Sequence, residues 1–219
     1  MSLLFHNDYF DNEIPDNIYR KLNKDRGVNY HFRSDNVGKC SLLYDDFRRS
    51  GLKFTKKNWE KYYFKRQSKE PLIEASDYIK QKYKIDLVTA KKYVHFRVIG
   101  QTWNGMINEE NIIKELEKEY LNIYFLKTEY EKDEQYFTDW EAWHRKTLLF
   151  GIQIKPISYS KMFTPYQLKA KENHKKQSDK YSKKYGVPHI IIYYENKKIH
   201  NKQSVLDRID TIMFYKSYE

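Results

Sequence analysis

The chain has 219 residues, of which 40% are hydrophobic and 32% are charged. This balance is typical of a soluble globular protein with one sizeable domain, or a core with an appended subdomain. Its 21 tyrosines and 12 phenylalanines exclude a disordered chain. No apolar run approaches about 18 residues, so no membrane span is expected. The acidic start MSLLFHNDYFDNE is not expected to be a secretion signal, and the lone Cys40 excludes an internal disulfide and a cysteine-based zinc site. We therefore expect a cytoplasmic protein.

The net charge indicates the kind of partner. Lys and Arg number 41 against 30 Asp and Glu, which gives +11 and a pI near 9.3. A basic excess of this size favours a polyanion, because lysine and arginine bind phosphates and release counterions. The alternative is that a lysine-rich, AT-biased genome produces basic proteins with no nucleic-acid role.

Residues 1–100 are basic and aromatic, and we expect them to form a mainly helical region that contacts DNA. Within them, residues 47–69 contain only one acid, Glu60, and nine basic residues: Arg48, Arg49, Lys53, Lys56, Lys57, Lys61, Lys65, Arg66 and Lys69. Interleaved aromatic residues are Trp59, Tyr62, Tyr63 and Phe64. Cations beside rings suit a nucleic-acid surface. The alternative is an amphipathic helix with its rings in the core and its lysines in water.

Two short helices are predicted next. The first has apolar residues at helical spacing, namely Leu72, Ala75, Ile79 and Tyr83. A break at residues 84–86 follows, and Asp86 is placed as the N-cap of a second helix with Leu87, Ala90 and Val94. Such a pair can be a helix-turn-helix that reads the major groove. The residues that would then face DNA are Thr89, Lys91, Lys92 and His95. An ordinary helical hairpin is the alternative.

Residues 102–194 have a regular pattern of helices and strands. The expected order is a helix (108–121), three strands (122–126, 136–143 and 148–155), a helix (164–185) and a strand (189–194). The second and third strands are joined by a turn at residues 144–146. Gly186 is expected to end the second helix, and the run HIIIYY is typical of a buried strand. These elements predict an α/β fold with a small mixed sheet flanked by helices.

Polar residues on the second and third strands form a candidate site. Gln153 and Lys155 share one strand face, and Ile152 and Ile154 share the other, because side chains alternate along a strand. If the two strands pair antiparallel, Asp139 lies beside Gln153 and Lys155. Carboxylate and carbonyl oxygens bind Mg²⁺, which lowers the pKa of a bound water and neutralises charge on a phosphate. An adjacent ammonium stabilises the charge that develops in hydrolysis.

The tripeptide Gln153-Ile154-Lys155 is a weak signal by spacing alone. Similar tripeptides begin at Gln67, Gln167 and Glu195. Gln153-Ile154-Lys155 differs from these because its polar pair lies in the otherwise apolar strand FGIQIKP, where burying polar groups without partners would be costly. The alternative is an edge strand with a solvated polar face.

The preceding helix offers a second carboxylate. Glu109 precedes Ile112 and Ile113 by three and four residues and so lies near the apolar stripe, and Gly105 would allow close backbone approach. Glu109 is the candidate second metal ligand, with Glu110 as the fallback. The alternative is that both are ordinary acids of a first helical turn, where they complement the helix dipole.

The order of elements, with an acid on the second strand and a (D/E)-x-K position on the third, resembles the PD-(D/E)XK nuclease superfamily. Thr138-Asp139 stands where Pro-Asp would, and Gln153 stands where an acid would. The stretch TWNGMINEEN…TDWEAW…GIQIKPISY also resembles MjaI-type restriction endonucleases. The resemblance implies that residues 101–219 form a catalytic core. It implies that Mg²⁺ is held by Asp139, the Gln153 side chain and the Ile154 carbonyl, with Lys155 at the water. Glu109, the candidate from the helix pattern, would restore the charge that Gln153 lacks.

The resulting prediction is a Mg²⁺-dependent type II restriction endonuclease that cuts double-stranded DNA at a short sequence as a homodimer. The residues expected to contact DNA are Arg48, Arg49, Lys56, Lys57, Lys65, Arg66, Lys91, Lys92, Lys169, Lys175 and Lys176. The alternatives are a structure-specific repair or junction-resolving nuclease and a non-catalytic nucleic-acid-binding protein. The seven histidines form no zinc motif, and no P-loop, GxGxxG or GxSxG occurs.

Overall fold

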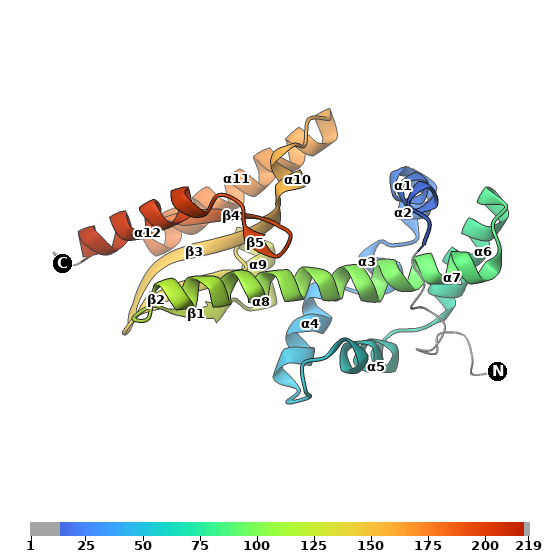
Figure 1. Cartoon of the computed structure of the whole chain (residues 1–219), viewed down its shortest axis with the longest axis horizontal. Coiled ribbons are helices and arrows are strands. Elements are labelled where there is room, and N and C mark those ends of the chain that lie inside the picture. The colour runs from blue at the N-terminus through green and yellow to red at the C-terminus, as the bar shows by residue number, and fades with distance from the viewer. Residues whose placement is uncertain (1–13, 217–219) are drawn as a thin grey trace. The chain divides into compact units, whose positions relative to one another are not determined.

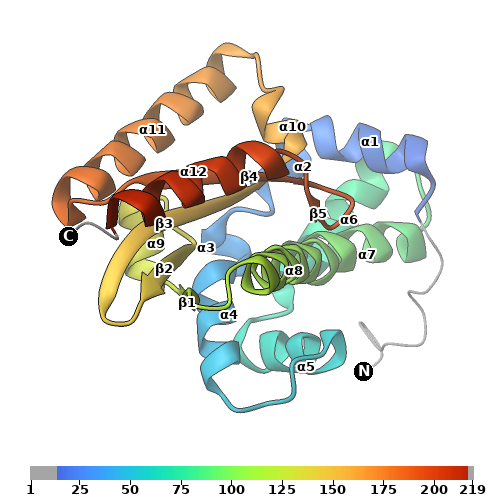
Figure 2. The same ribbon diagram turned by 60° about the vertical axis from the view of Figure 1, so that its left-hand side comes forward.

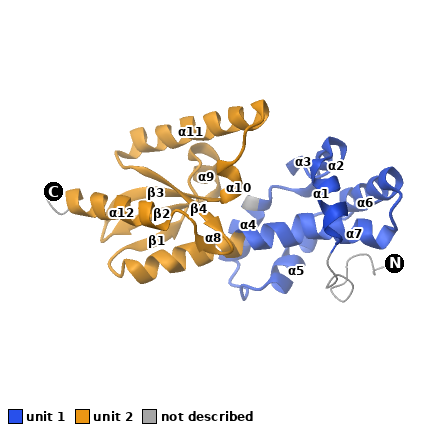
Figure 3. Cartoon of the chain, turned by 45° about the horizontal axis from the view of Figure 1, so that its top comes forward, with its two compact units in different colours: residues 1–105 blue, residues 106–219 orange. Residues whose placement is uncertain are grey.

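The computed structural model describes residues 14–216 (Figure 1). The acidic segment 1–13, which was not expected to be a secretion signal, lies outside the described residues. The chain divides into two compact units, residues 1–105 and 106–219 (Figure 3). No helix among the described residues is long and apolar enough to cross a membrane.

The described part of the N-terminal unit is helical. Its elements are α1 (Asp16–Lys24), α2 (Arg26–Tyr30), α3 (Ser34–Val37), α4 (Cys40–Arg49), α5 (Lys56–Arg66), α6 (Glu70–Tyr83), α7 (Leu87–His95), the π-helix η2 (Phe96–Gly100) and the start of α8 (Gln101–Glu119). The predicted helix pair is confirmed as α6 and α7. Asp86 accepts a hydrogen bond from the backbone N–H of Thr89 at 2.8 Å and so caps α7.

The core of this unit is aromatic. Phe47, Trp59 and Tyr63 are buried, and the hydroxyl of Tyr63 donates to the Val37 carbonyl at 2.8 Å. Tyr62 is buried as well. The idea that these interleaved rings meet bases or sugars is therefore wrong for three of the four, because they pack the core while the adjacent lysines are exposed.

The C-terminal unit is α/β. Besides the remainder of α8, its elements are β1 (Tyr124–Lys127), α9 (Tyr130–Tyr136), β2 (Trp140–His144), β3 (Thr147–Pro156), α10 (Ile157–Ser160), α11 (Pro165–Tyr185), β4 (His189–Glu195), β5 (Lys198–Ile199) and α12 (Lys202–Lys216). The strands form one sheet in the order β1-β2-β3-β4-β5. β3 and β4 are parallel and the other neighbours are antiparallel, so the predicted mixed sheet is confirmed.

Helices cover both faces of this sheet (Figure 2). On one face, apolar residues of α8 and α12 pack against Ile152, Ile154 and Ile192 of the central strands. On the other face, Tyr181 of α11 lies where a side chain at Gly151 would clash with it at 2.6 Å. The absent side chain thus allows α11 to pack closely on β3.

The polar helix α11 was correctly predicted, and its ends show why. Thr164 and Gln167 form a capping box at its start, and Gly186 ends it with φ at 67°. The strand predicted over 136–143 is partly wrong, since residues up to Tyr136 belong to the helix α9 and the strand begins at Trp140. Phe137 ends α9 in the left-handed conformation, with φ at 55°, and this conformation turns the chain between the helix and the strand.

The helix expected over 108–121 begins earlier, because α8 starts at Gln101 and continues directly from η2. A side chain at Gly105 would meet no atom within 4 Å among the described residues. Close backbone approach at this glycine is therefore not observed. α10, α12 and the two-residue β5 were not predicted.

Candidate active site

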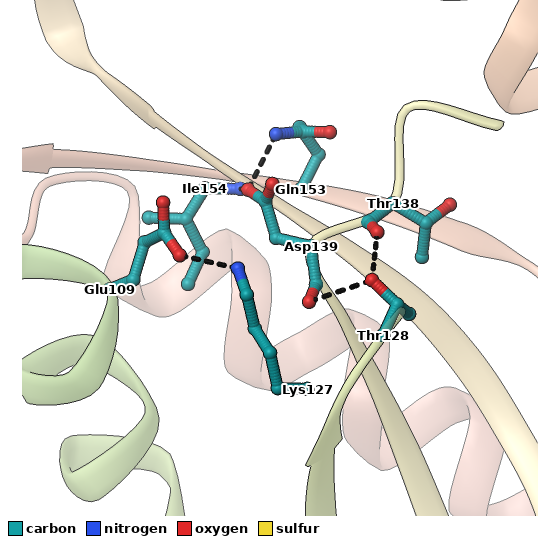
Figure 4. A network of polar contacts seen from close by, with 7 residues as sticks. All are labelled: Glu109, Lys127, Thr128, Thr138, Asp139, Gln153 and Ile154. Carbon is teal, nitrogen blue, oxygen red and sulfur yellow. Dashed lines mark hydrogen bonds and ion pairs between the residues drawn. The ribbon is translucent and has the colours of Figure 1, made fainter. Parts of the chain in front are cut away.

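Asp139 lies immediately before β2, beside the middle of β3. Its backbone N–H donates to the Ile152 carbonyl at 2.8 Å, and Trp140 pairs with Ile152 in the antiparallel ladder. This register brings Asp139 next to Gln153, as the strand pattern predicted. Oδ2 of Asp139 accepts hydrogen bonds from Gln153 Nε2 at 2.5 Å and from the Ile154 N–H at 2.8 Å (Figure 4).

Gln153 is completely buried, and its amide is only half satisfied. Nε2 binds Asp139, but Oε1 has no hydrogen-bond partner among the described residues. β3 pairs with β2 on one side and β4 on the other, so the alternative of a solvated edge strand is wrong. An orphaned buried amide oxygen is costly, and a protein tolerates such a cost more often at a functional site than elsewhere.

Glu109, on α8, lies close enough to Asp139 to interact with it electrostatically. Its Oε2 lies 2.6 Å from Nζ of Lys127, the last residue of β1 (Figure 4). Burial raises the pKa of Glu109 and Asp139 raises it further, while Lys127 opposes the shift. Glu109 lies in the interior of α8, eight residues after Gln101. The alternative of a first-turn acid is therefore wrong.

Lys155 follows Gln153 by two residues on β3 and is half buried. Its ammonium lies 4.6 Å from the ring centroid of Phe137, and that ring stacks on His174 of α11 at 3.9 Å. Nδ1 of His174 lies 2.9 Å from the Tyr159 hydroxyl. Burial and the charge of Lys155 lower the pKa of His174. The lysine is thus held on an aromatic stack.

Two further charged residues belong to this cluster and were not predicted: Lys127 and Asp133. Burial opposes the charge of Lys127, but Glu109 and Asp139 hold its pKa above the usual value. Burial, and after it repulsion from Asp139, raises the pKa of Asp133 on α9 to about 7. Lys127 directly follows an apolar strand, which was a usable signal. Asp133 lies in the charged run EYEKDEQY, which offered none.

Two other acids near the site, Glu141 and the fallback Glu110, are placed differently. Glu141 is buried on β2, where it accepts a hydrogen bond from the Tyr181 hydroxyl at 2.6 Å and forms an ion pair with Lys132. Its charge is therefore satisfied away from Asp139. Glu110 is half buried on α8, next to Glu109.

Hydrogen bonds to its backbone carbonyl hold Asp139 in place. The Thr128 N–H and hydroxyl each donate to the Asp139 carbonyl at 3.0 Å, and the same hydroxyl contacts the Thr138 carbonyl (Figure 4). Thr138 itself is buried. The replacement of the proline of the motif by threonine therefore leaves the carboxylate firmly positioned.

The donor set suits a hard cation. Asp139 and Glu109 supply carboxylates, and Gln153 supplies an amide oxygen without a partner. Within residues 14–216, no three His, Cys, Asp or Glu side chains stand close enough together to hold a metal by themselves. A metal here would therefore be completed by groups other than a third acid, histidine or cysteine, such as the Gln153 amide, a backbone carbonyl or water.

The comparison with protein families decides the identity of the chain. The model of the MjaI restriction endonuclease family matches residues 22–210. The chain belongs to the MjaI restriction endonuclease family. No curated protein and no solved structure matches it. The match spans every residue of the site described above, from Glu109 to Lys155.

Membership makes this protein a restriction endonuclease, and so a DNA endonuclease that binds DNA.

Most cations expected to contact DNA are on the surface of this restriction endonuclease. The exposed ones are Arg48, Arg49, Lys56, Lys57, Lys65, Arg66, Lys169, Lys175 and Lys176. Lys91 and Lys92 on α7 are half buried. His95 is buried, with Nε2 at 3.0 Å from Glu60, and the Thr89 hydroxyl binds Asp86 at 2.7 Å. The prediction that His95 faces DNA is therefore wrong.

Proposed function

We propose that this member of the MjaI family is a type II restriction endonuclease that requires Mg²⁺ and cuts duplex DNA at a short specific sequence. We assign its C-terminal unit to the PD-(D/E)XK nuclease fold. The observation that carries this proposal is the pairing of Asp139 with the buried, half-satisfied amide of Gln153. A buried carboxylate beside an unpaired oxygen is an arrangement that a hard cation stabilises.

Four groups would hold the metal: the carboxylates of Asp139 and Glu109, the Gln153 amide oxygen and the Ile154 carbonyl. Both hydrogen bonds to Asp139 reach Oδ2, so Oδ1 is available as a ligand within the described part of the chain. When bound, Mg²⁺ would lower the pKa of a water and neutralise charge on the scissile phosphate.

The Gln153 amide must turn for this role. Its Nε2 now faces Asp139, so the amide oxygen faces away from the carboxylate. Rotation about the last side-chain bond would place two oxygens side by side, and a bound cation would offset their repulsion. The same rotation would let the cation satisfy the amide oxygen that now lacks a partner, and it would move Nε2 to the position that this oxygen leaves.

Lys155 is assigned to the attacking water and to the developing negative charge. Its ammonium is fixed over Phe137, so little conformational entropy is lost when it acts. Lys127 is paired with Glu109 at 2.6 Å and acts as the positive charge that keeps the buried acids together.

A palindromic site is the simplest target for an enzyme that cuts both strands, and it implies a homodimer with two-fold symmetry. We propose this dimer, acting in the cytoplasm, as the functional form. The exposed cations of α4, α5 and α11 would contact backbone phosphates and fix the position of the duplex.

Digestion of a sequenced plasmid, followed by mapping of the ends, tests the proposal. We expect discrete fragments with one shared sequence at their ends, formed with Mg²⁺ or Mn²⁺ and absent with EDTA. Cleavage confined to branched or damaged DNA would indicate a repair or junction-resolving nuclease. DNA binding without any cleavage in either metal would indicate a non-catalytic binding protein.

A further inference from the structure

The connection between α10 and α11 carries exposed apolar side chains. Phe163 is 76% exposed and Tyr166 is 84% exposed, and Leu168, two residues further along α11, is about half exposed. Residues 161–168 are called the tip below. Large apolar groups gathered on an exposed surface often mark a contact site, because leaving them in water is unfavourable.

The tip is held in a fixed conformation. The ammonium of Lys171 donates to the Ser160 carbonyl at 2.9 Å and to the Met162 carbonyl at 3.2 Å. Thr164 and Gln167 exchange hydrogen bonds at 3.1 and 3.4 Å, which fixes the start of α11. The two rings are therefore presented on an ordered backbone, and little entropy is lost when they bind a partner.

The charge around the tip selects the class of partner. Residues 155–171 contain four lysines and no acidic residue. Lys161 and Lys169 are exposed beside the rings. Cations next to exposed rings match a nucleic acid, in which phosphates alternate with sugars and flat bases. An acidic protein surface would match the lysines but leave the rings without a specific partner.

The tip is also connected to the candidate active site, through β3 on one side and α11 on the other. β3 carries Gln153 and Lys155 and leads directly into α10, and α11 returns to the site through His174, which stacks on Phe137 at 3.9 Å. The start of α11 extends away from the sheet (Figure 1). Seven residues, 156–162, separate Lys155 from Phe163, and the eight steps along the chain span at most about 30 Å. That reach is less than one turn of the duplex, roughly 34 Å.

We propose that Phe163 and Tyr166 contact duplex DNA within one helical turn of the scissile phosphate, with their rings against bases or sugars. This inference rests on the proposed function, because the duplex must lie at Lys155. It adds a contact surface that is made of rings, whereas the cations above supply phosphate contacts.

The test measures binding of a labelled duplex that contains the mapped site, by fluorescence anisotropy without divalent metal. The double variant Phe163→Ala/Tyr166→Ala is expected to bind about tenfold or more weakly, since burial of two apolar rings against the duplex contributes at least that much. The dependence of its affinity on salt should equal that of the wild type, because no charge is removed.

Two controls separate ring contact from general damage. The variant Phe163→Tyr/Tyr166→Phe keeps both rings and should bind as the wild type does. Tyr215→Ala removes an exposed ring of α12, 67% exposed, and should also leave binding unchanged. If the double variant fails to fold, Tyr166→Ala alone is measured, and a loss of severalfold is expected.

Three results would overturn the inference. One is a double variant that binds within twofold of the wild type. Another is a double variant that sediments as a monomer where the wild type is a dimer, which would assign the tip to a second copy of this chain. The third is weakening by Tyr215→Ala to the same degree. If the wild type itself neither binds nor cuts DNA, the proposed function fails first and the inference fails with it.

Discussion

The two units bury charge in different ways. In the N-terminal unit, the buried Glu60 carboxylate lies 3.0 Å from the buried His95 ring, so one acid meets one basic group. In the C-terminal unit, acids outnumber lysines in one electrostatic neighbourhood, formed by Glu109, Asp133, Asp139, Lys127 and Lys155. A matched pair is satisfied by folding alone. An excess of carboxylate costs stability, and a cation that binds there recovers the loss.

This contrast predicts the largest effects on the rate of cleavage. Asp139→Ala and Lys155→Ala should each lower the single-turnover rate on the mapped duplex by about three orders of magnitude or more. Both should retain DNA binding, which anisotropy measures.

Glu60→Gln is the matched change in the helical unit. It should lower the urea midpoint of unfolding, because a neutral amide replaces the carboxylate beside the His95 ring, without slowing cleavage by the folded protein. If a folded Asp139→Ala variant cuts at nearly the wild-type rate, the excess of acids in the C-terminal unit has no role in cleavage.

The next effect concerns the metal requirement. Glu109→Gln removes one of two candidate carboxylate ligands, so the Mg²⁺ concentration for half-maximal cleavage should rise about tenfold or more. Gln153→Glu restores the commoner acidic ligand and should leave that concentration unchanged or lower it. If Glu109→Gln leaves the dependence of the cleavage rate on Mg²⁺ concentration unchanged, Glu109 is not a metal ligand. Asp133, which interacts electrostatically with Asp139, is then the next candidate.

Sequence patterns predicted the elements of this site well where burial repeats regularly. β4 is a continuous apolar run, β3 is largely apolar around the polar pair Gln153 and Lys155, and the capping residues of α11 mark both of its ends. The pairing of Asp139 with Gln153 followed from alternation on antiparallel strands, and the structure places them 2.5 Å apart.

What could not be predicted depends on contacts between distant elements. The strand predicted over 136–143 begins at Tyr136, the last residue of α9, and the rest of α9 was not predicted; nothing local signals that Phe137 is left-handed. Lys127 enters the site from β1, which pairs with β2, and Asp133 enters it from α9, which packs on α11. The spacing of Val205, Ile209 and Ile212 did signal the helix α12, although it was not predicted.

A smaller effect is expected in the dependence of stability on pH. Burial lowers the pKa of His189 from 6.5 to about 4, and its Nδ1 lies 2.6 Å from the Ser178 hydroxyl. As the pH falls, the unfolded chain takes up this proton before the folded protein does. The stabilisation is therefore complete above pH 6.5 and is lost towards pH 4, by about 3 kcal/mol.

His189→Gln should flatten this loss in urea unfolding between pH 7.5 and 4. Asp133, whose pKa is raised to about 7, acts in the opposite direction, since its contribution falls as the pH rises from 4 towards 7. The difference between wild type and variant isolates His189. Parallel curves for the two proteins would show that His189 does not titrate in this window.

The smallest effects are expected from surface cations of both units. Lys56→Gln/Lys57→Gln on α5 and Lys169→Gln/Lys175→Gln on α11 should weaken binding to all duplex sequences alike. Each phosphate contact that is lost should reduce the slope of log affinity against log salt by about 0.9. Lys114→Gln/Lys118→Gln, two exposed lysines of α8 outside the predicted set, serves as the control. Equal slopes for all variants would assign the phosphate contacts to other residues.

The central claim is that the excess carboxylate around Asp139 binds a divalent cation. Calorimetric titration of Mn²⁺ into the metal-free protein tests it without any assay of cleavage. We expect the wild type to bind Mn²⁺, Asp139→Asn to lose that binding, and Asp77→Asn, which removes an exposed acid of α6, to behave as the wild type does. Undiminished Mn²⁺ binding by a folded Asp139→Asn would contradict the account.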